Sequence, residues 1–296
     1  MHSPLIYLFA ILSARNKALH SNVHPIVGEP SLSMVSQSVA AYSHDVNTGM
    51  LRKMQSKADV IAFSNELQKL ISSGRVQVAE HKLLSCLRRF ERLEEGINPD
   101  SIHFGIVIKG WCKGNGSSLL KAEQLLDKMQ DMYLSGRMWL RPNAVVFNNV
   151  IMSYSRQGNV SKVEELYDKM KEFYYEGNVD VKPNVLTLNF MLDSLSKSFE
   201  RKKRQEPIVN PSRAEDIIKN MKNEFGIRPD TITYNLFINA WVKSSHPDSA
   251  RKAEAIVREM IEKVENGQQS VEPDIFTYNS ILVRFHSIFS DLADIF

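Results

Sequence analysis

Cysteine is scarce in this chain, and so are long apolar runs. Of 296 residues only Cys86 and Cys112 are cysteines, and they fit no CxxC or Cys/His spacing. Neither a disulfide framework nor a zinc site is therefore supported, so we expect two small buried side chains. The longest apolar run of the leader, Leu5 to Leu12, is far shorter than the roughly 20 residues that span a bilayer. No membrane segment is expected.

Enzyme signatures are also missing. There is no GxxxxGK or GxSxG motif, and the glycines of segment 113–117 follow no strand, which predicts a turn. His20 and His24 have no companion ligand nearby. Adjacent acids such as Glu164 and Glu165 suit an exposed helix surface better than a two-carboxylate site. We therefore expect neither catalysis nor a cofactor or metal.

The amino-terminal segment lacks acidic residues. Its first 28 residues contain no Asp or Glu but carry Arg15, Lys17 and several serines. This composition is typical of an organelle transit peptide, so residues 1–55 are interpreted as a mitochondrial leader, with the plastid as the alternative. The apolar run would also suit a signal peptide, and a disordered start or a wrong first exon stays open. The net charge of +3 is too small to argue nucleic-acid binding from totals.

A repeat fills residues 56–296. A proline followed by Asp or Asn recurs at Pro99, Pro142, Pro183, Pro229 and Pro273, at intervals of 41 to 46 residues. Spacing this regular indicates stacked structural units. The predicted units are 60–100, 101–143, 144–184, 185–230, 231–274 and a partial unit 275–296.

Each unit is expected to contain two helices. A first helix such as Ala144 to Arg156 has apolar residues at helical spacing. A second helix repeats one apolar template at i, i+3, i+4 and i+7, and Ser161 and Ser212 are expected to cap two of these helices. The template residues are Ala122, Leu125, Leu126, Met129; Val163, Leu166, Tyr167, Met170; Ala214, Ile217, Ile218, Met221; and Ala253, Ile256, Val257, Met260. Stacked pairs of this kind predict an all-α solenoid with a long concave surface.

Three segments resemble one known family. They are PDTITYNLFINAWVK from Pro229, PDIFTYNSI from Pro273 and KGWCK at Lys109 to Lys113, and they are similar to the pentatricopeptide repeat family. The resemblance covers Val60 to Phe296 and implies a right-handed superhelix that binds single-stranded RNA. Its usual period is about 35 residues. Here five extra residues in four units lengthen either the second helix or its exit, the segment that leads to the next unit. In the fourth unit the extra residues lie between the two helices, in segment 199–211.

The resemblance implies one apolar residue per unit that separates neighbouring bases. We call these side chains the wedge residues; the alternative is ordinary core packing. They are Ile61, Ile102, Val145, Leu186, Ile232 and Phe276.

The resemblance also implies one base-reading pair per unit. The pairs are Ser64 with Asp100, Gly105 with Asn143, Asn148 with Asn184, Asn189 with Asp230, and Asn235 with Asp274, while Asn279 has no partner. By the family's code they predict a pyrimidine-rich, U-containing 5′-G-N-Y-U-U-Y site, in which Gly105 reads nothing. Helix capping explains the closing Asp or Asn equally well. It does not explain the repeated Asn one turn inside the later first helices, where its propensity is poor.

Cations near the ends of the first helices form the third group. The resemblance implies that Lys113, Arg156, Lys197 and Lys243 face the phosphates, although a helix C-terminus favours cations in any case. The run Arg201 to Arg204 could touch flanking RNA or be a solvated loop.

The leading hypothesis is sequence-selective binding of single-stranded RNA in organelle RNA metabolism, for stabilisation, processing or translation. One alternative is a helical scaffold that holds organelle RNA-processing or ribosomal proteins. Another is the recognition part of a longer enzyme, because the chain ends at Phe296 after one helix of its sixth unit and leaves Ile281, Phe285 and Phe289 without a partner helix.

Overall fold

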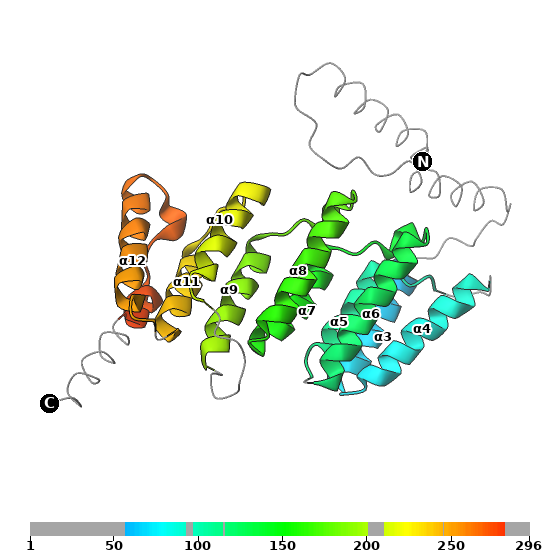
Figure 1. Ribbon diagram of the computed structural model, residues 1–296. Coiled ribbons are helices and arrows are strands. Elements are labelled where there is room, and N and C mark those ends of the chain that lie inside the picture. The colour runs from blue at the N-terminus through cyan, green and yellow to red at the C-terminus, as the bar shows by residue number, and fades with distance from the viewer. Residues whose placement is uncertain (1–56, 93–96, 115, 201–209, 245, 282–296) are drawn as a thin grey trace, which may run out of the picture.

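The computed structural model describes residues 57–92, 97–114, 116–200, 210–244 and 246–281 (Figure 1). Within these ranges the elements are the α-helices α3 to α12, a further helical stretch at residues 275–281 and three short 3-10 helices, without strands. The leader 1–55, the run Arg201 to Arg204, and Phe285 and Phe289 lie outside the described residues.

The helices form pairs that follow one another in a single row (Figure 1). The predicted all-α solenoid of helix-turn-helix repeats is confirmed. The first helices are α3 (Lys57–Ser72), α5 (Ser101–Trp111), α7 (Ala144–Arg156), α9 (Val185–Glu200) and α11 (Thr231–Lys243). The second helices are α4 (Val76–Glu91), α6 (Ser117–Leu134), α8 (Val160–Tyr175), α10 (Arg213–Phe225) and α12 (Ser249–Glu265).

One continuous core runs between the two layers of helices. Every residue of the second-helix template is buried except Ile218, which is half-buried. Successive first helices pack directly against one another, and each second helix packs against its own first helix and the next. Gly110 shows how close the first helices come, because a Cβ there would lie 2.9 Å from Ile71. The first helices thus form one unbroken layer.

The extra residues lie in the exits of the second helices. They form the 3-10 helices η1 (Met138–Leu140), η2 (Val179–Val181) and η3 (Gln269–Val271). A glycine with positive φ precedes each of them: Gly136, Gly177 and Gly267. Each 3-10 helix buries its last residue, Leu140, Val181 or Val271, against the core. In the three units whose exits contain these 3-10 helices, the lengthened exit is therefore the correct one of the two predicted possibilities.

Exits of neighbouring units are also joined. Arg141 Nε donates to Asn178 Oδ1 at 2.8 Å, and its guanidinium lies 3.2 Å from Asp180 Oδ2. Asn178 Nδ2 donates to the carbonyl of Pro142 at 3.0 Å. The longer repeat therefore adds a polar contact between units that the helix pairs alone do not provide.

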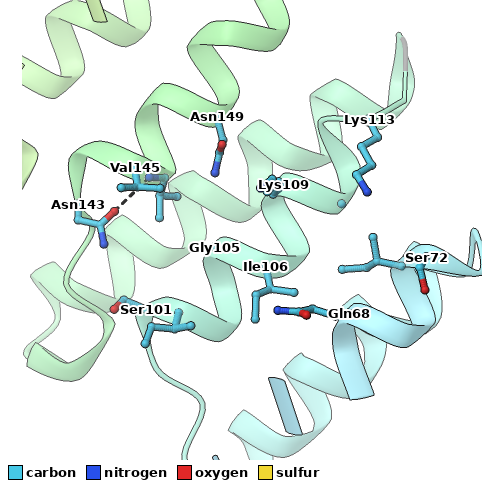
Figure 2. A pocket seen from close by; sticks show the side chains of 14 residues that line it. Gln68, Ser72, Ser101, Gly105, Ile106, Lys109, Lys113, Asn143, Val145 and Asn149 are labelled. Atoms are coloured by element: carbon cyan, nitrogen blue, oxygen red, sulfur yellow. Dashed lines mark hydrogen bonds between the residues drawn. The ribbon is translucent and has the colours of Figure 1, made fainter. Parts of the chain in front are cut away.

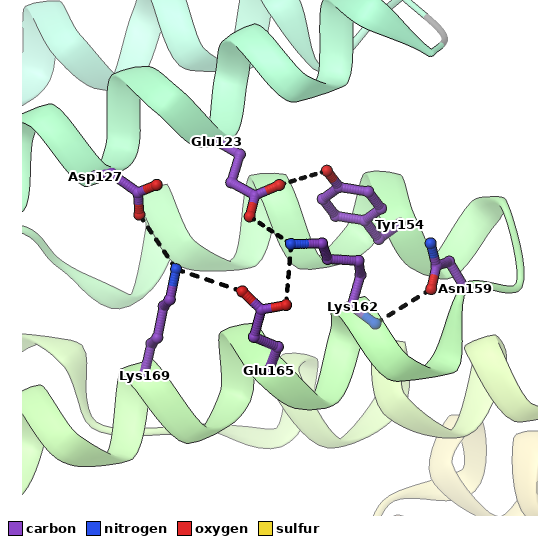
Figure 3. Close-up of polar contacts among 7 residues, drawn as sticks. All are labelled: Glu123, Asp127, Tyr154, Asn159, Lys162, Glu165 and Lys169. Carbon is purple, nitrogen blue, oxygen red and sulfur yellow. Dashed lines mark hydrogen bonds and ion pairs between the residues drawn. The ribbon is translucent and has the colours of Figure 1, made fainter.

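The second helices carry a ladder of ion pairs (Figure 3). Lys162 of α8 lies 2.8 Å from the buried Glu123 of α6, which also accepts a hydrogen bond from Tyr154 at 2.6 Å. Equivalent positions are joined by Arg213–Glu164 at 2.6 Å and Lys252–Glu215 at 2.8 Å. Each pair connects one unit to the next, so the ladder fixes the spacing of the outer layer.

The predicted capping box is absent from two second helices, although Ser212 does occupy the N-cap position of α10. Helix α8 is capped by Asn159, whose side chain accepts from the Lys162 N–H, and Ser161 lies inside the helix. Ser212 precedes α10 but its side chain makes no capping bond. Asn159 caps α8 because it lies two residues before Ser161, where the chain leaves the Gly158 turn and can still adopt a non-helical conformation.

Candidate nucleic-acid interface

All six wedge residues are exposed, although they are large and apolar. Their exposed fractions run from 52% for Leu186 to 69% for Phe276. Four of them are the second residues of α5, α7, α9 and α11, and these helices pack side by side. The core-packing alternative is wrong for these positions, since the residues that fill the core come one and two places later. An exposed apolar residue repeated at one place per unit needs a reason other than packing.

The closing Asp or Asn of each unit caps the next first helix. Asp230 Oδ1 accepts from the Thr233 N–H at 2.8 Å, and Asn143 Oδ1 accepts from the Val146 N–H at 3.1 Å. Asp100, Asn184 and Asp274 make equivalent bonds. The capping alternative is therefore correct, and it places each polar group two residues before a wedge residue.

Three of the five predicted base-reading pairs are brought into contact. Asn148 Nδ2 donates to Asn184 Oδ1 at 3.2 Å, and Asn235 Nδ2 donates to Asp274 Oδ1 at 3.1 Å. Asn189 and Asp230 are joined through the hydroxyl of Thr233, at 2.7 and 2.8 Å. The two members of each pair are 36 to 41 residues apart in sequence, so the stacking of units assembles them.

A buried threonine orients each of these asparagines, and sequence reasoning missed it. Thr187, Thr233 and Thr277 have no exposed surface. Their hydroxyls lie 2.9, 2.7 and 2.6 Å from the side-chain oxygens of Asn148, Asn189 and Asn235. Because that oxygen is occupied, each amide is held in one orientation. A threonine three residues after the closing Asp or Asn was the available signal.

The first two units are built differently. His103 takes the place of threonine, and its Nδ1 accepts from the Asp100 N–H at 3.2 Å. Burial raises the pKa of Asp100, but the hydrogen bonds from His103 and Ile102 outweigh it and hold the pKa below its ordinary value. No hydrogen bond joins Ser64 to Asp100 within the described chain, and Gly105 has no side chain to offer Asn143.

A pocket of about 610 Å³ lies between α3, α5 and α7 (Figure 2). It is lined by five of the predicted site residues from all three groups: Ile102, Val145, Gly105, Asn143 and Lys113. Lys109 and Asn149 also line it, and neither was singled out from the sequence as a site residue. The residue types expected around one base are thus gathered around one hollow.

The predicted phosphate-facing cations differ in their surroundings. Lys113 and Arg156 are exposed. Lys197 is half-buried and lies 2.6 Å from Asp193, which also accepts a hydrogen bond from Ser155. Lys243 is half-buried near the end of α11. The positive charges of these four residues are therefore not equally available to a ligand.

Among the described residues, no cluster of three or more His, Cys, Asp or Glu side chains could hold a metal ion. None of the described helices is both long enough and apolar enough to cross a membrane. Cys112 is buried and Cys86 half-buried, and both are free thiols.

Comparisons with known proteins give a consistent family. Residues 142–197 match the model of the PPR repeat family, and residues 209–244 match the pentatricopeptide repeat domain. Among curated proteins no sequence matches the chain. Two similar solved structures are those of the pentatricopeptide repeat protein PPR10 and of a variant of it with cysteines replaced by serine, both in complex with an 18-nt psaJ RNA element.

Each PPR10 structure shares 20% identity with this chain at a TM-score of 0.47. The match covers 87% of this chain but 30% of PPR10, so the chain spans less than a third of that protein's length. The matched repeats span α7, most of α9 and all of α11, which carry the asparagines of the three joined base-reading pairs. On these repeat matches, the chain carries pentatricopeptide repeats in residues 142–197 and 209–244.

Proposed function

We propose that this protein binds single-stranded RNA, one base per repeat, along the row of first helices. The observation that carries the proposal is the exposure of all six wedge residues at one position per unit. Unstacked bases have apolar faces that a duplex hides, and side chains at regular spacing can separate and stack on them. The role proposed is in organelle RNA metabolism, with a mitochondrial or plastid location, and no catalytic step is assigned to the chain.

Selectivity would come from the amides beside the wedge residues. An Asn side chain offers both donors and acceptors, which suits the mixed edge of uracil or cytosine. In the third, fourth and fifth units this amide is fixed by a buried threonine. The side chain therefore loses little rotational freedom when it binds a base. The expected order of bases, 5′ to 3′ from the amino-terminal unit, is G-N-Y-U-U-Y.

Affinity would come in part from the exposed cations Lys113 and Arg156. Each phosphate neutralised on a single strand adds about 0.7 to the slope of log affinity against log salt. This contribution is independent of sequence and only positions the strand.

The test is a binding series on the full chain with short RNAs that carry single-base changes. A strand matching the expected order should bind better than its duplex. It should lose affinity when either of the two uracils read by Asn189 and Asn235 becomes A or G. Changing Ile102, Val145, Leu186 and Ile232 together to Ala should weaken binding to every RNA, while the melting temperature stays close to wild type because these side chains are exposed. Equal binding of all variants, or capture of a partner protein with no RNA affinity, would reject the proposal in favour of a scaffold.

A further inference from the structure

The second unit has a pocket where the family's code predicts no reading. Gly105 stands at the position that holds Asn148, Asn189 and Asn235 in later units, so the polar group that would meet the base is missing. The pocket at this place has a volume of about 610 Å³, within the range of roughly 300–1,000 Å³ found for small-molecule sites. It is large enough for a purine with its sugar.

Lys109 lies one helical turn after Gly105 and lines the same pocket (Figure 2). The equivalent positions of the other units hold Gln68, Met152, Asp193 and Asn239, so a cation occurs here in the second unit alone. Its side chain is exposed. The one unit whose reading position holds no polar side chain is therefore the one with a lysine beside the base position.

The lining of the pocket is rich in donors and free of acids. Lys109 and Lys113 carry positive charge, and Asn143 and Asn149 offer amide groups. Asn143 Oδ1 already accepts from the Val146 N–H, which leaves its Nδ2 as the group available to a ligand. None of the fourteen residues that line the pocket is Asp or Glu. A ligand edge made of acceptors fits such a lining.

We propose that this pocket selects guanine at the second position of the RNA, with Lys109 as the specificity-determining residue. Ile102 and Val145 would stack on the base, and the Lys109 ammonium would donate to its O6 and N7 atoms. Guanine presents two acceptors on this edge, whereas adenine places its N6 donor against the cation and cytosine presents its N4 donor there. Uracil has one acceptor on that edge, and its single ring leaves the space at Gly105 unfilled.

This inference rests on the proposed RNA function and refines the expected order of bases to G-G-Y-U-U-Y. It is tested by binding the full chain to 5′-GNUUUU RNA with each of the four bases at N. The guanine strand should bind roughly tenfold more tightly than the uracil strand, as one good lysine–guanine contact allows. Lys109→Met, which copies the third unit, should remove this preference and leave uracil selectivity at the fourth base unchanged. Lys128→Met on the exposed face of α6 is the control for loss of a positive charge, and it should keep the guanine preference.

A second variant tests the space at Gly105. A Cβ there would lie 3.4 Å from Val146, an ordinary contact, so Gly105→Asn should fold normally. It restores an Asn–Asn pair like that of Asn148 and Asn184 and should move the preference from guanine to a pyrimidine. If wild type binds all four strands equally while the fourth and fifth bases still discriminate, the guanine assignment is overturned and the proposed function stands. If no strand binds, both are overturned.

Discussion

Asn235 and Asp274 are 39 residues apart in sequence, yet the Asn235 amide donates to the Asp274 carboxylate at 3.1 Å. Asn235 belongs to one first helix and Asp274 caps the next, so the pair exists only when two units are stacked. In the proposed function, base reading would therefore be a property of neighbouring units together, and contacts that hold units in register should also affect selectivity.

The buried threonines provide the first prediction. Thr233→Val removes the hydroxyl that joins Asn189 to Asp230 and leaves the Asn189 oxygen without its partner. An unsatisfied buried polar group costs about 1–3 kcal/mol, so the free energy of unfolding should fall by that amount. Selectivity for uracil at the fourth base should weaken as well, because the amide can rotate. Chemical denaturation and the RNA series measure the two effects.

Thr233→Ser is the matched control, because it keeps the hydroxyl and should retain the selectivity. A Thr233→Val protein that is destabilised but reads the fourth base as wild type does would contradict an orienting role for this threonine.

The cations lead to a second prediction about salt. Lys113→Gln and Arg156→Gln should each reduce the slope of log affinity against log salt by about 0.7. Lys197→Gln should reduce it less, because Asp193 already lies 2.6 Å from the ammonium. Asp193→Asn should steepen the slope by freeing that charge. Equal slopes in all variants would show that phosphates lie elsewhere.

The ion-pair ladder predicts a difference between two equivalent glutamates. Glu123→Gln should lower the free energy of unfolding by about 1–3 kcal/mol, since the buried carboxylate bonds both Tyr154 and Lys162 (Figure 3). Glu254 occupies the same template position in α12 but is exposed and pairs with Arg258 of its own helix. Glu254→Gln should therefore change stability by less than about 1 kcal/mol. Similar losses in both variants, measured by denaturant unfolding, would contradict the role given to the ladder.

Acid stability should depend on the caps of the first helices. Although burial raises the pKa of Asp274, hydrogen bonds from Thr277, Asn235 and Phe276 together lower it below the ordinary value of 3.8. A depressed carboxyl pKa stabilises the fold above the unfolded pKa, and this stability is lost as the pH falls through the folded value. Stability should therefore decline below about pH 3.8. Asp274→Asn keeps a capping oxygen and should make that decline shallower. If the free energy of unfolding of this variant falls with acid as steeply as that of wild type, Asp274 does not contribute to acid stability.

The sequence was sufficient to predict the helix pairs, the core and the caps of the first helices. Proline spacing and the template Ala122, Leu125, Leu126 and Met129 are local signals, and helical periodicity alone determines which face is buried. Whether Ile102 and its equivalents are buried or exposed could not be decided from the pattern. Their neighbours are apolar too, and the answer depends on how close adjacent first helices lie.

Contacts between units were the least predictable part of the site. The hydrogen bonds from Thr233 to Asn189 and from Ser155 to Asp193 each join two different units, so they depend on how the units stack and no single-unit motif encodes them. The pocket at Gly105 was missed for a similar reason. Within one repeat, a glycine shows only that a side chain is missing. The pocket forms only when α3, α5 and α7 are packed together.

The claim that Asn and Asp pairs on stacked units read bases is tested most directly by changing one pair. Asn235→Ser should turn the fifth unit into a Ser–Asp pair, which the family's code assigns to guanine. The account predicts that an RNA with G at the fifth base then binds more tightly than one with U, while selectivity at the fourth base stays unchanged. If the variant still prefers U at the fifth base, or if selectivity changes equally at every position, Asn235 does not read that base.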